Sequence, residues 1–111
     1  MSDDLLKKFG MKYRDFVIVP PKNAEELIKE GQTLHHCVGT YISKISTGRS
    51  IVLFIRKADK QEEPYCTIEI VDGKVYQCRG KHNADMKETL KGLLNLFNKT
   101  KLMQMVEREA V

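Results

Sequence analysis

The sequence lacks any long apolar run, since no stretch approaches the roughly 18 residues that a membrane-spanning helix needs. Its first residues, SDDLLKKFG, include two acids and no extended apolar segment, so they do not predict a secretory signal. The hydrophobic share of 41% and the charged share of 31% are typical of a soluble globular chain. We therefore expect one cytoplasmic domain over residues 1–111, with residues 1–15 forming a helical N-terminal appendage.

Cysteine is also scarce. The chain has three cysteines, an odd number, and a reducing cytosol would keep them as thiols, so a disulfide framework is not expected. The sequence has no CxxC or HxxxH spacing and no glycine-rich loop of the kind that cradles phosphate. What it does carry is positive charge, and the net charge of +4 favours encounter with acidic partners such as nucleic acid.

Three short helices are predicted in the first half of the chain, and each ends at a glycine. Their ranges are 3–9, 24–30 and 34–48. Asn23 is the expected N-cap of the second helix, Glu26 fits the reciprocal capping arrangement three residues later, and Gly31 is expected to end that helix.

Strands are predicted at three places. Residues 16–21, FVIVPP, have strand-type side chains and close on two prolines, which suit a sheet edge or a strand end. The apolar run at 50–56, SIVLFIR, predicts a central strand that is buried on both faces. The pair Asp72-Gly73 between two alternating segments predicts a β-hairpin.

The register of this hairpin decides which residues share a face of the sheet. A two-residue turn pairs apolar residues with apolar residues and places Cys66 and Cys78 on opposite faces, with Gln77 and Arg79 on the face of Cys66. A three-residue loop with a glycine bulge would shift the register by one and place both cysteines on the same face. We favour the first register.

A long C-terminal helix is predicted from Met86 to about Arg108, with Asp85 as its N-cap and an apolar stripe that covers one sheet face. The stripe comprises Leu90, Leu93, Leu94, Phe97, Leu102 and Val106. The predicted fold class is therefore α+β, with an antiparallel sheet of three to four strands packed by this helix and by the shorter N-terminal helices.

Two histidines and a cysteine, His35, His36 and Cys37, are consecutive near the start of the predicted helix 34–48. Adjacent helical residues point about 100° apart, so these three side chains cannot all serve one centre. Zinc ligation is one hypothesis for this cluster, and a buried structural thiol with hydrogen-bonded histidines is the alternative. The candidate zinc ligands are His36, Cys37, Cys78 and His82.

A second hypothesis is an enzyme acting on nucleic acid or a nucleotide, with Cys37 as a nucleophile that His36 activates. Neighbours in sequence are poorly placed to exchange a proton, and Glu69 is the only evident carboxylate partner. We therefore favour a non-enzymatic binding module and keep the enzyme as the alternative.

The third hypothesis is nucleic-acid binding by the second strand of the hairpin. The segment GKVYQCRGKHN holds three basic residues and no acid, and Tyr76 offers a surface on which a base can stack. An ordinary solvated basic edge is the alternative. The predicted binding residues are His36, Tyr41, Arg56, Tyr76, Gln77, Arg79, Lys81 and Asn83, with Lys74 and His82 beside them.

Four segments in this order and spacing, LHHCVGTYISKISTG, SIVLFIRK, EPYCTIEI and VYQCRGKHN, resemble the core of the PcfJ-like family of conjugative plasmids and related mobile elements. The resemblance covers residues 16–100, and family members are often longer, with this region toward their C-terminal end. By this resemblance the family-type positions are His36, Cys37, Tyr41, Arg56, Thr67, Glu69, Gln77, Arg79, Gly80 and Asn83.

The resemblance implies a bacterial mobile-element setting, with a nucleic acid or a nucleoprotein complex as the partner. In that setting a small domain could inhibit a host defence protein, as an anti-CRISPR protein does. We expect the start of helix 34–48 to face the RGKHN end of the hairpin, so that His36 and Cys37 act jointly with Gln77, Arg79 and Asn83.

Overall fold

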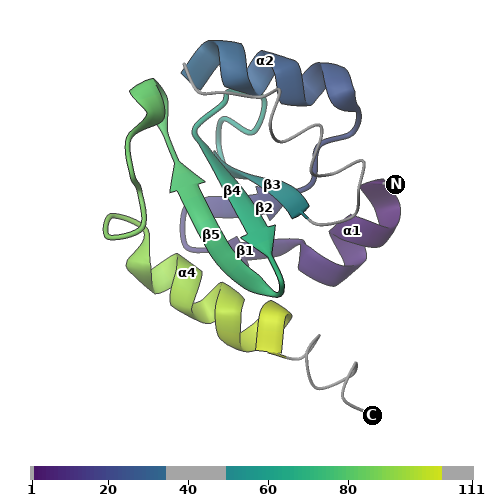
Figure 1. Ribbon diagram of the computed structural model, residues 1–111, viewed down its shortest axis with the longest axis vertical. Coiled ribbons are helices and arrows are strands. Elements are labelled where there is room, and N and C mark those ends of the chain that lie inside the picture. The colour runs from purple at the N-terminus through teal and green to yellow at the C-terminus, as the bar shows by residue number, and fades with distance from the viewer. Residues whose placement is uncertain (1, 35–49, 104–111) are drawn as a thin grey trace.

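A computed structural model describes residues 2–34 and 50–103 of the chain (Figure 1). They form one five-stranded antiparallel sheet with the strand order β1-β2-β3-β4-β5, and helices lie on both of its faces. The elements are α1 (Ser2–Phe9), β1 (Met11–Tyr13), β2 (Phe16–Val19), α2 (Ala24–Leu34), β3 (Ser50–Lys57), β4 (Cys66–Val71), β5 (Lys74–Arg79), the 3-10 turn η1 (Lys81–Asn83), α4 (Lys91–Phe97) and the π-helical turn η2 (Asn98–Leu102).

The α+β class is confirmed, but the predicted count of three to four strands is wrong. The additional strand is β1, which is only three residues long and pairs with β2 across a tight turn at Arg14, where φ is 53°. Because β1 occupies the edge, β2 lies inside the sheet rather than at an edge. Phe9 of α1 is 1% exposed and belongs to the main apolar core, and Met11 and Tyr13 of β1 pack against that core.

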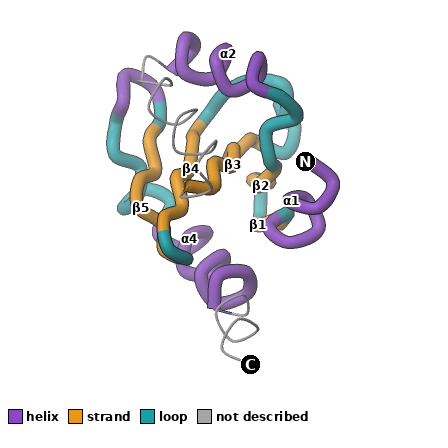
Figure 2. The backbone as a smooth tube through the Cα atoms, turned by 45° about the vertical axis from the view of Figure 1, so that its right-hand side comes forward, coloured by secondary structure: helices purple, strands orange, loops and turns teal. Residues whose placement is uncertain are grey.

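One face of the sheet carries the main apolar core. Side chains from β3, β4 and β5 alternate toward this face and pack against α1 and α4, and Figure 2 shows α4 on the side of the sheet opposite α2. Burial of this apolar surface is the main source of folding free energy. The buried residues of this core are Phe9, Ile18, Leu53, Ile55, Cys66, Ile68, Ile70, Cys78, Leu90, Leu93, Phe97 and Leu102.

Helix α2 covers the other face and begins as predicted. The backbone N–H of Glu26 donates to Asn23 Oδ1 over 2.9 Å, while the Glu26 carboxylate accepts from the backbone of Lys22, one residue before the predicted position. The prediction that Gly31 ends the helix is wrong, because the helix continues to Leu34. The seven-residue interval between Leu27 and Leu34 places both on the face toward the sheet, and their burial stabilises the helix through the glycine.

The hairpin turn is confirmed, but the favoured register holds only next to it. Asp72 and Gly73 have φ of 52° and 75°, as a type I′ turn requires, and Ile70 pairs with Val75. A β-bulge then shifts the register, so that Ile68 opposes Cys78. The prediction that the two cysteines point to opposite faces is therefore wrong.

The bulge has a physical reason. It turns Cys78, which is 0% exposed, toward the apolar core beside Cys66. It also turns Gln77 and Arg79 to the other face, where their cross-strand neighbours are Glu69 and Thr67. In the predicted register without a bulge, the polar side chains of Gln77 and Arg79 would face the core, which costs free energy unless each has a hydrogen-bond partner.

The C-terminal helix begins later than predicted. The Asp85 carboxylate accepts from the Lys87 backbone over 3.0 Å, but the Met86 backbone donates to Cys78 O, so residues 85 and 86 run beside β5 and cannot start a helix. Helix α4 therefore starts at Lys91. Leu102 follows Phe97 by five residues, and the wider π-helical turn keeps both on the buried side. The predicted continuation over 104–108 lies outside the described residues.

Candidate functional site

The sheet face beneath α2 carries a row of polar side chains, unlike the apolar face on the opposite side. They come from four elements. Those on the strands share one face because side chains alternate between the two faces along each strand and paired residues of neighbouring strands point to the same face, and Glu30 reaches this face from α2. The set consists of Glu30 from α2, Ser50 and Arg56 from β3, Thr67 and Glu69 from β4, and Gln77 and Arg79 from β5.

The centre of this row is an ion pair between Glu30 and Arg56. The guanidinium donates two hydrogen bonds to the carboxylate, of 2.7 Å to Oε1 and 2.5 Å to Oε2, and Glu30 is 0% exposed. Thr67 Oγ1 donates to the same carboxylate over 3.2 Å, and Arg56 Nε donates to Gln61 O over 3.1 Å. The guanidinium also lies 4.4 Å from the ring centroid of Phe54. The ion pair therefore fixes α2 onto the sheet.

A second buried carboxylate lies farther along the same face. Glu69 is 1% exposed, and Ser50 Oγ donates to its Oε2 over 2.8 Å. Gln77 is the cross-strand neighbour of Glu69 on β5. Glu30 is thus enclosed with guanidinium and hydroxyl groups and Glu69 with a hydroxyl group, and such partners are the usual way in which buried acids are tolerated.

Burial and the ion pair act in opposite directions on Glu30. Loss of hydration raises the pKa of the Glu30 carboxyl above its ordinary value, and the hydrogen bonds and charge of Arg56 oppose that rise. Because Glu30 joins α2 to Arg56 of the sheet, the protonation state of this carboxyl is linked to the packing of α2.

The outer strand of the sheet and the turn after it form an exposed basic surface, here called the β5–η1 surface and defined as residues 74–83. Tyr76 is 54% exposed, and the segment holds three basic residues and no acid. Its exposed residues are Lys74, Tyr76, Lys81, His82 and Asn83, with Gln77 and Arg79 partly exposed.

The shape of this surface is held by its backbone. His82 and Asn83 have φ of 57° and 59°, and the Gly80 N–H donates to Ala84 O over 2.9 Å. An Arg79 N–H donates to Asn83 O over 3.5 Å. The turn therefore has a defined conformation that presents Lys81, His82 and Asn83 outward.

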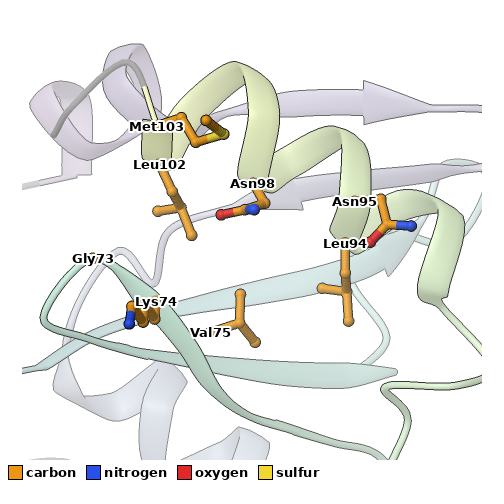
Figure 3. Close-up of a pocket in the computed structure, with 8 residues that line it drawn as sticks. All are labelled: Gly73, Lys74, Val75, Leu94, Asn95, Asn98, Leu102 and Met103. Carbon is orange, nitrogen blue, oxygen red and sulfur yellow. The ribbon is translucent and has the colours of Figure 1, made fainter. Parts of the chain in front are cut away.

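A surface cavity of about 580 Å³ adjoins the turn end of the β5–η1 surface, between the hairpin and the C-terminal helical segment (Figure 3). Its walls are largely apolar, and Lys74 belongs both to the cavity and to the β5–η1 surface. The residues that line it are Gly73, Lys74, Val75, Leu94, Asn95, Asn98, Leu102 and Met103.

The structure brings together only some of the predicted binding residues. Tyr76, Gln77, Arg79, Lys81 and Asn83 share the β5–η1 surface. Arg56 is separate, since it is 7% exposed and its charge is satisfied by Glu30 inside the fold. Glu30 and Ser50 are not among the residues predicted from the sequence. Glu30 lies between Leu27 and Leu34 on one helical face, and an acid on such an apolar face is a signal that could have identified it.

His36, Cys37 and Tyr41 lie outside the described residues, so their joint action with the hairpin and the alternative of an enzyme stay predictions. Among the described elements, η1 lies against α2, and Figure 1 shows it beside the C-terminal end of that helix.

The predicted zinc ligands do not converge where the structure describes them. Cys78 is 0% exposed in the apolar core with its Sγ 3.2 Å from Cys66 Sγ, whereas His82 is exposed on η1. Zinc bound by the predicted set would require Cys78 to leave the core. Within residues 2–34 and 50–103, no three histidine, cysteine or acidic side chains form a group that could hold a metal ion.

None of the helices in the described part of the chain is long and apolar enough to cross a membrane. The fold and the site together define a small α+β domain, in which a five-stranded meander carries a buried polar row on one face and a basic outer edge.

Comparison with known proteins identifies the family. A family model described as PcfJ-like protein matches residues 2–94, and the chain therefore belongs to the PcfJ-like family. The uncharacterized protein Lin1253/Lin1744 of Listeria innocua is 33% identical over 94% of this chain. The alignment covers 24% of that protein, so the chain spans about a quarter of its length. No solved structure matches the chain significantly.

Proposed function

We propose that this domain is a non-enzymatic module that binds single-stranded nucleic acid through the β5–η1 surface. The observation that carries the proposal is Tyr76, an aromatic side chain that is 54% exposed on an outer strand, in a segment (residues 74–83) that holds three basic residues and no acid. An exposed tyrosine offers its ring to an unstacked base, and such stacking contributes about 1–3 kcal/mol per base.

The remaining groups of the surface suit the backbone of the same ligand. Lys74, Arg79 and Lys81 supply positive charge on both sides of Tyr76, and Gln77 and Asn83 supply amides. Phosphate contacts position a strand, while amides can bond to base edges or phosphates. A single strand is favoured over a duplex because only an unpaired base exposes its face to a side chain.

The setting that we propose for this activity is a bacterial mobile genetic element, as the family resemblance suggests. The target there is a strand exposed during DNA transfer or within a nucleoprotein complex. Stable co-purification with a host defence protein, together with no affinity for free nucleic acid, would instead favour a protein-docking inhibitor.

The test is binding of a fluorescent single-stranded oligonucleotide, measured by anisotropy at several salt concentrations. Each phosphate contact on a single strand contributes about −0.7 to the slope of log K against log salt. Contacts from Lys74, Arg79 and Lys81 thus predict a slope of about −2. Affinity that does not change with salt would contradict the proposal.

Substitutions locate the site. We expect Tyr76→Ala to weaken binding about tenfold, and Lys74→Ala with Lys81→Ala to reduce the salt slope by about 1.4. The matched control is Lys7→Ala with Lys8→Ala, which removes the same charge from exposed positions on α1, a helix that contacts β2 and lies away from β5 (Figure 2). Equal losses in both double variants would show that net charge, and not this surface, governs binding.

A further inference from the structure

Two of the three cysteines are in contact inside the apolar core. Cys66 on β4 and Cys78 on β5 are free thiols, both are 0% exposed, and their Sγ atoms are 3.2 Å apart. They are twelve positions apart in the chain and lie on neighbouring strands. Their closeness comes from tertiary structure, since the hairpin folds one strand back along the other.

The β-bulge is what brings them together. Ile68 opposes Cys78 across the strands, and Cys66 lies two residues from Ile68 on the same face, so the cysteines form a diagonal cross-strand pair. Without the extra residue in β5, Cys78 would oppose Thr67 and point away from Cys66. A change in register by one residue therefore makes the difference between a contacting pair and two separate thiols.

We propose that Cys66 and Cys78 are a modification site, at which a peroxide converts the two thiols into a reversible intramolecular disulfide. One sulfur attacks a peroxide oxygen, which breaks the O–O bond, releases water and leaves a sulfenic acid. The second sulfur displaces the sulfenic oxygen as another water and forms the S–S bond. The thiols together lose two protons and two electrons, and hydrogen peroxide is reduced to two molecules of water.

The closed fold protects the pair from this reaction. The hydrogen bond with Cys78 and burial both raise the pKa of the Cys66 thiol, and the thiolate is the reactive form. The peroxide reaches the sulfurs when β5 separates from β4. Strand β5 is suited to such opening because it lies at the edge of the sheet and contains the bulge.

The disulfide would join β4 to β5 covalently and close a short loop around the Asp72-Gly73 turn. A cross-link of this loop length restricts the unfolded chain, and we expect the melting temperature to rise by about 5–10 °C on oxidation. The inference does not depend on nucleic-acid binding, because it is derived from the two thiols and the register alone.

The experiment treats the folded chain with hydrogen peroxide, blocks the remaining thiols and maps the peptides by mass spectrometry without reduction. The expected result is a peptide pair joined through Cys66 and Cys78, lighter by two hydrogen atoms and separated by dithiothreitol. The same treatment of a Cys37→Ser variant should give the same link, which shows that Cys37 does not take part. Free thiols in both proteins, or links to Cys37 alone, would overturn the proposal.

Two further measurements separate the native site from an artefact of unfolding. The link should form in buffer without denaturant, and formation only in urea would contradict the native geometry. Calorimetry should show a higher melting temperature for the oxidised protein than for the reduced one, while Cys78→Ala should show no change with peroxide. A lower melting temperature for the cross-linked protein would also count against the proposal.

Discussion

Removal of either partner of the Glu30–Arg56 ion pair should destabilise the domain strongly. Glu30 is 0% exposed and Arg56 is 7% exposed, so each substitution leaves an opposite charge enclosed without its partner. Breaking such a pair typically costs about 3–5 kcal/mol. For Glu30→Leu we expect about 4 kcal/mol, because the hydrogen bond from Thr67 is lost with the two from Arg56.

The double variant is the more informative one. Replacing both charges, as Glu30→Leu with Arg56→Met, leaves no buried ion and keeps apolar volume beneath α2, and such exchanges are often close to neutral. We therefore expect the double variant to lose no more than about 2 kcal/mol, much less than the sum of the single losses.

Guanidinium chloride unfolding, followed by circular dichroism, gives the free energy of unfolding for the four proteins of this cycle. Lys29→Ala, at an exposed position on α2, is the control and should change stability by less than about 0.5 kcal/mol. Additive losses within about 0.5 kcal/mol would refute the reasoning, because they would mean that the two side chains do not interact.

Three further predictions concern the same scaffold. Burial raises the pKa of the Glu30 carboxyl in the folded protein, so the native state binds the carboxyl proton more tightly than the unfolded chain does. The free energy of unfolding of the wild type, relative to that of Glu30→Gln, should therefore fall as pH rises from 4.5 through the raised pKa. Urea unfolding curves measured over that pH range would show the fall. Gly73→Ala should cost about 1 kcal/mol in the same melts, because φ of 75° strains any residue with a Cβ. Phe97→Ala should cost about 3–5 kcal/mol, since Phe97 is 0% exposed and its ring lies 6.3 Å from that of Phe9.

The sequence was most informative where local chemistry alone decides the structure. The apolar run at 50–56 predicts a central strand because no other arrangement buries both of its faces, and β3 has that position. The Asp72-Gly73 turn and the Asn23 cap depend on the preferences of single residues, and both are present.

Sequence reasoning failed where tertiary contacts override local signals. Gly31 would end an isolated helix, yet burial of Leu34 carries α2 through it. The bulge in β5 has no marker such as glycine, and its advantage is visible only once both faces of the sheet are known. The pairing of residues 85 and 86 with β5, which delays α4, is likewise a contact between distant segments.

For the candidate site, the sequence predicts binding by the basic segment 74–83, which is largely exposed, but it gives no sign that Arg56 is buried. A basic residue at the end of an apolar strand resembles a surface charge, and only the three-dimensional fold shows Glu30 against it. Gln77 and Arg79 are predicted binding residues, and the observed register gives them a polar face to share with Thr67 and Glu69.

The most direct test of the proposed function is an NMR titration of the isotope-labelled protein with a short single-stranded oligonucleotide. We expect the largest changes in amide chemical shift at residues 74–83, with the Tyr76 ring signals moving together with the amides. Amides of α1, which contacts β2 and lies away from β5 (Figure 2), should stay in place. Shifts that are absent at saturating oligonucleotide, or that are concentrated on α1, would contradict binding at the β5–η1 surface.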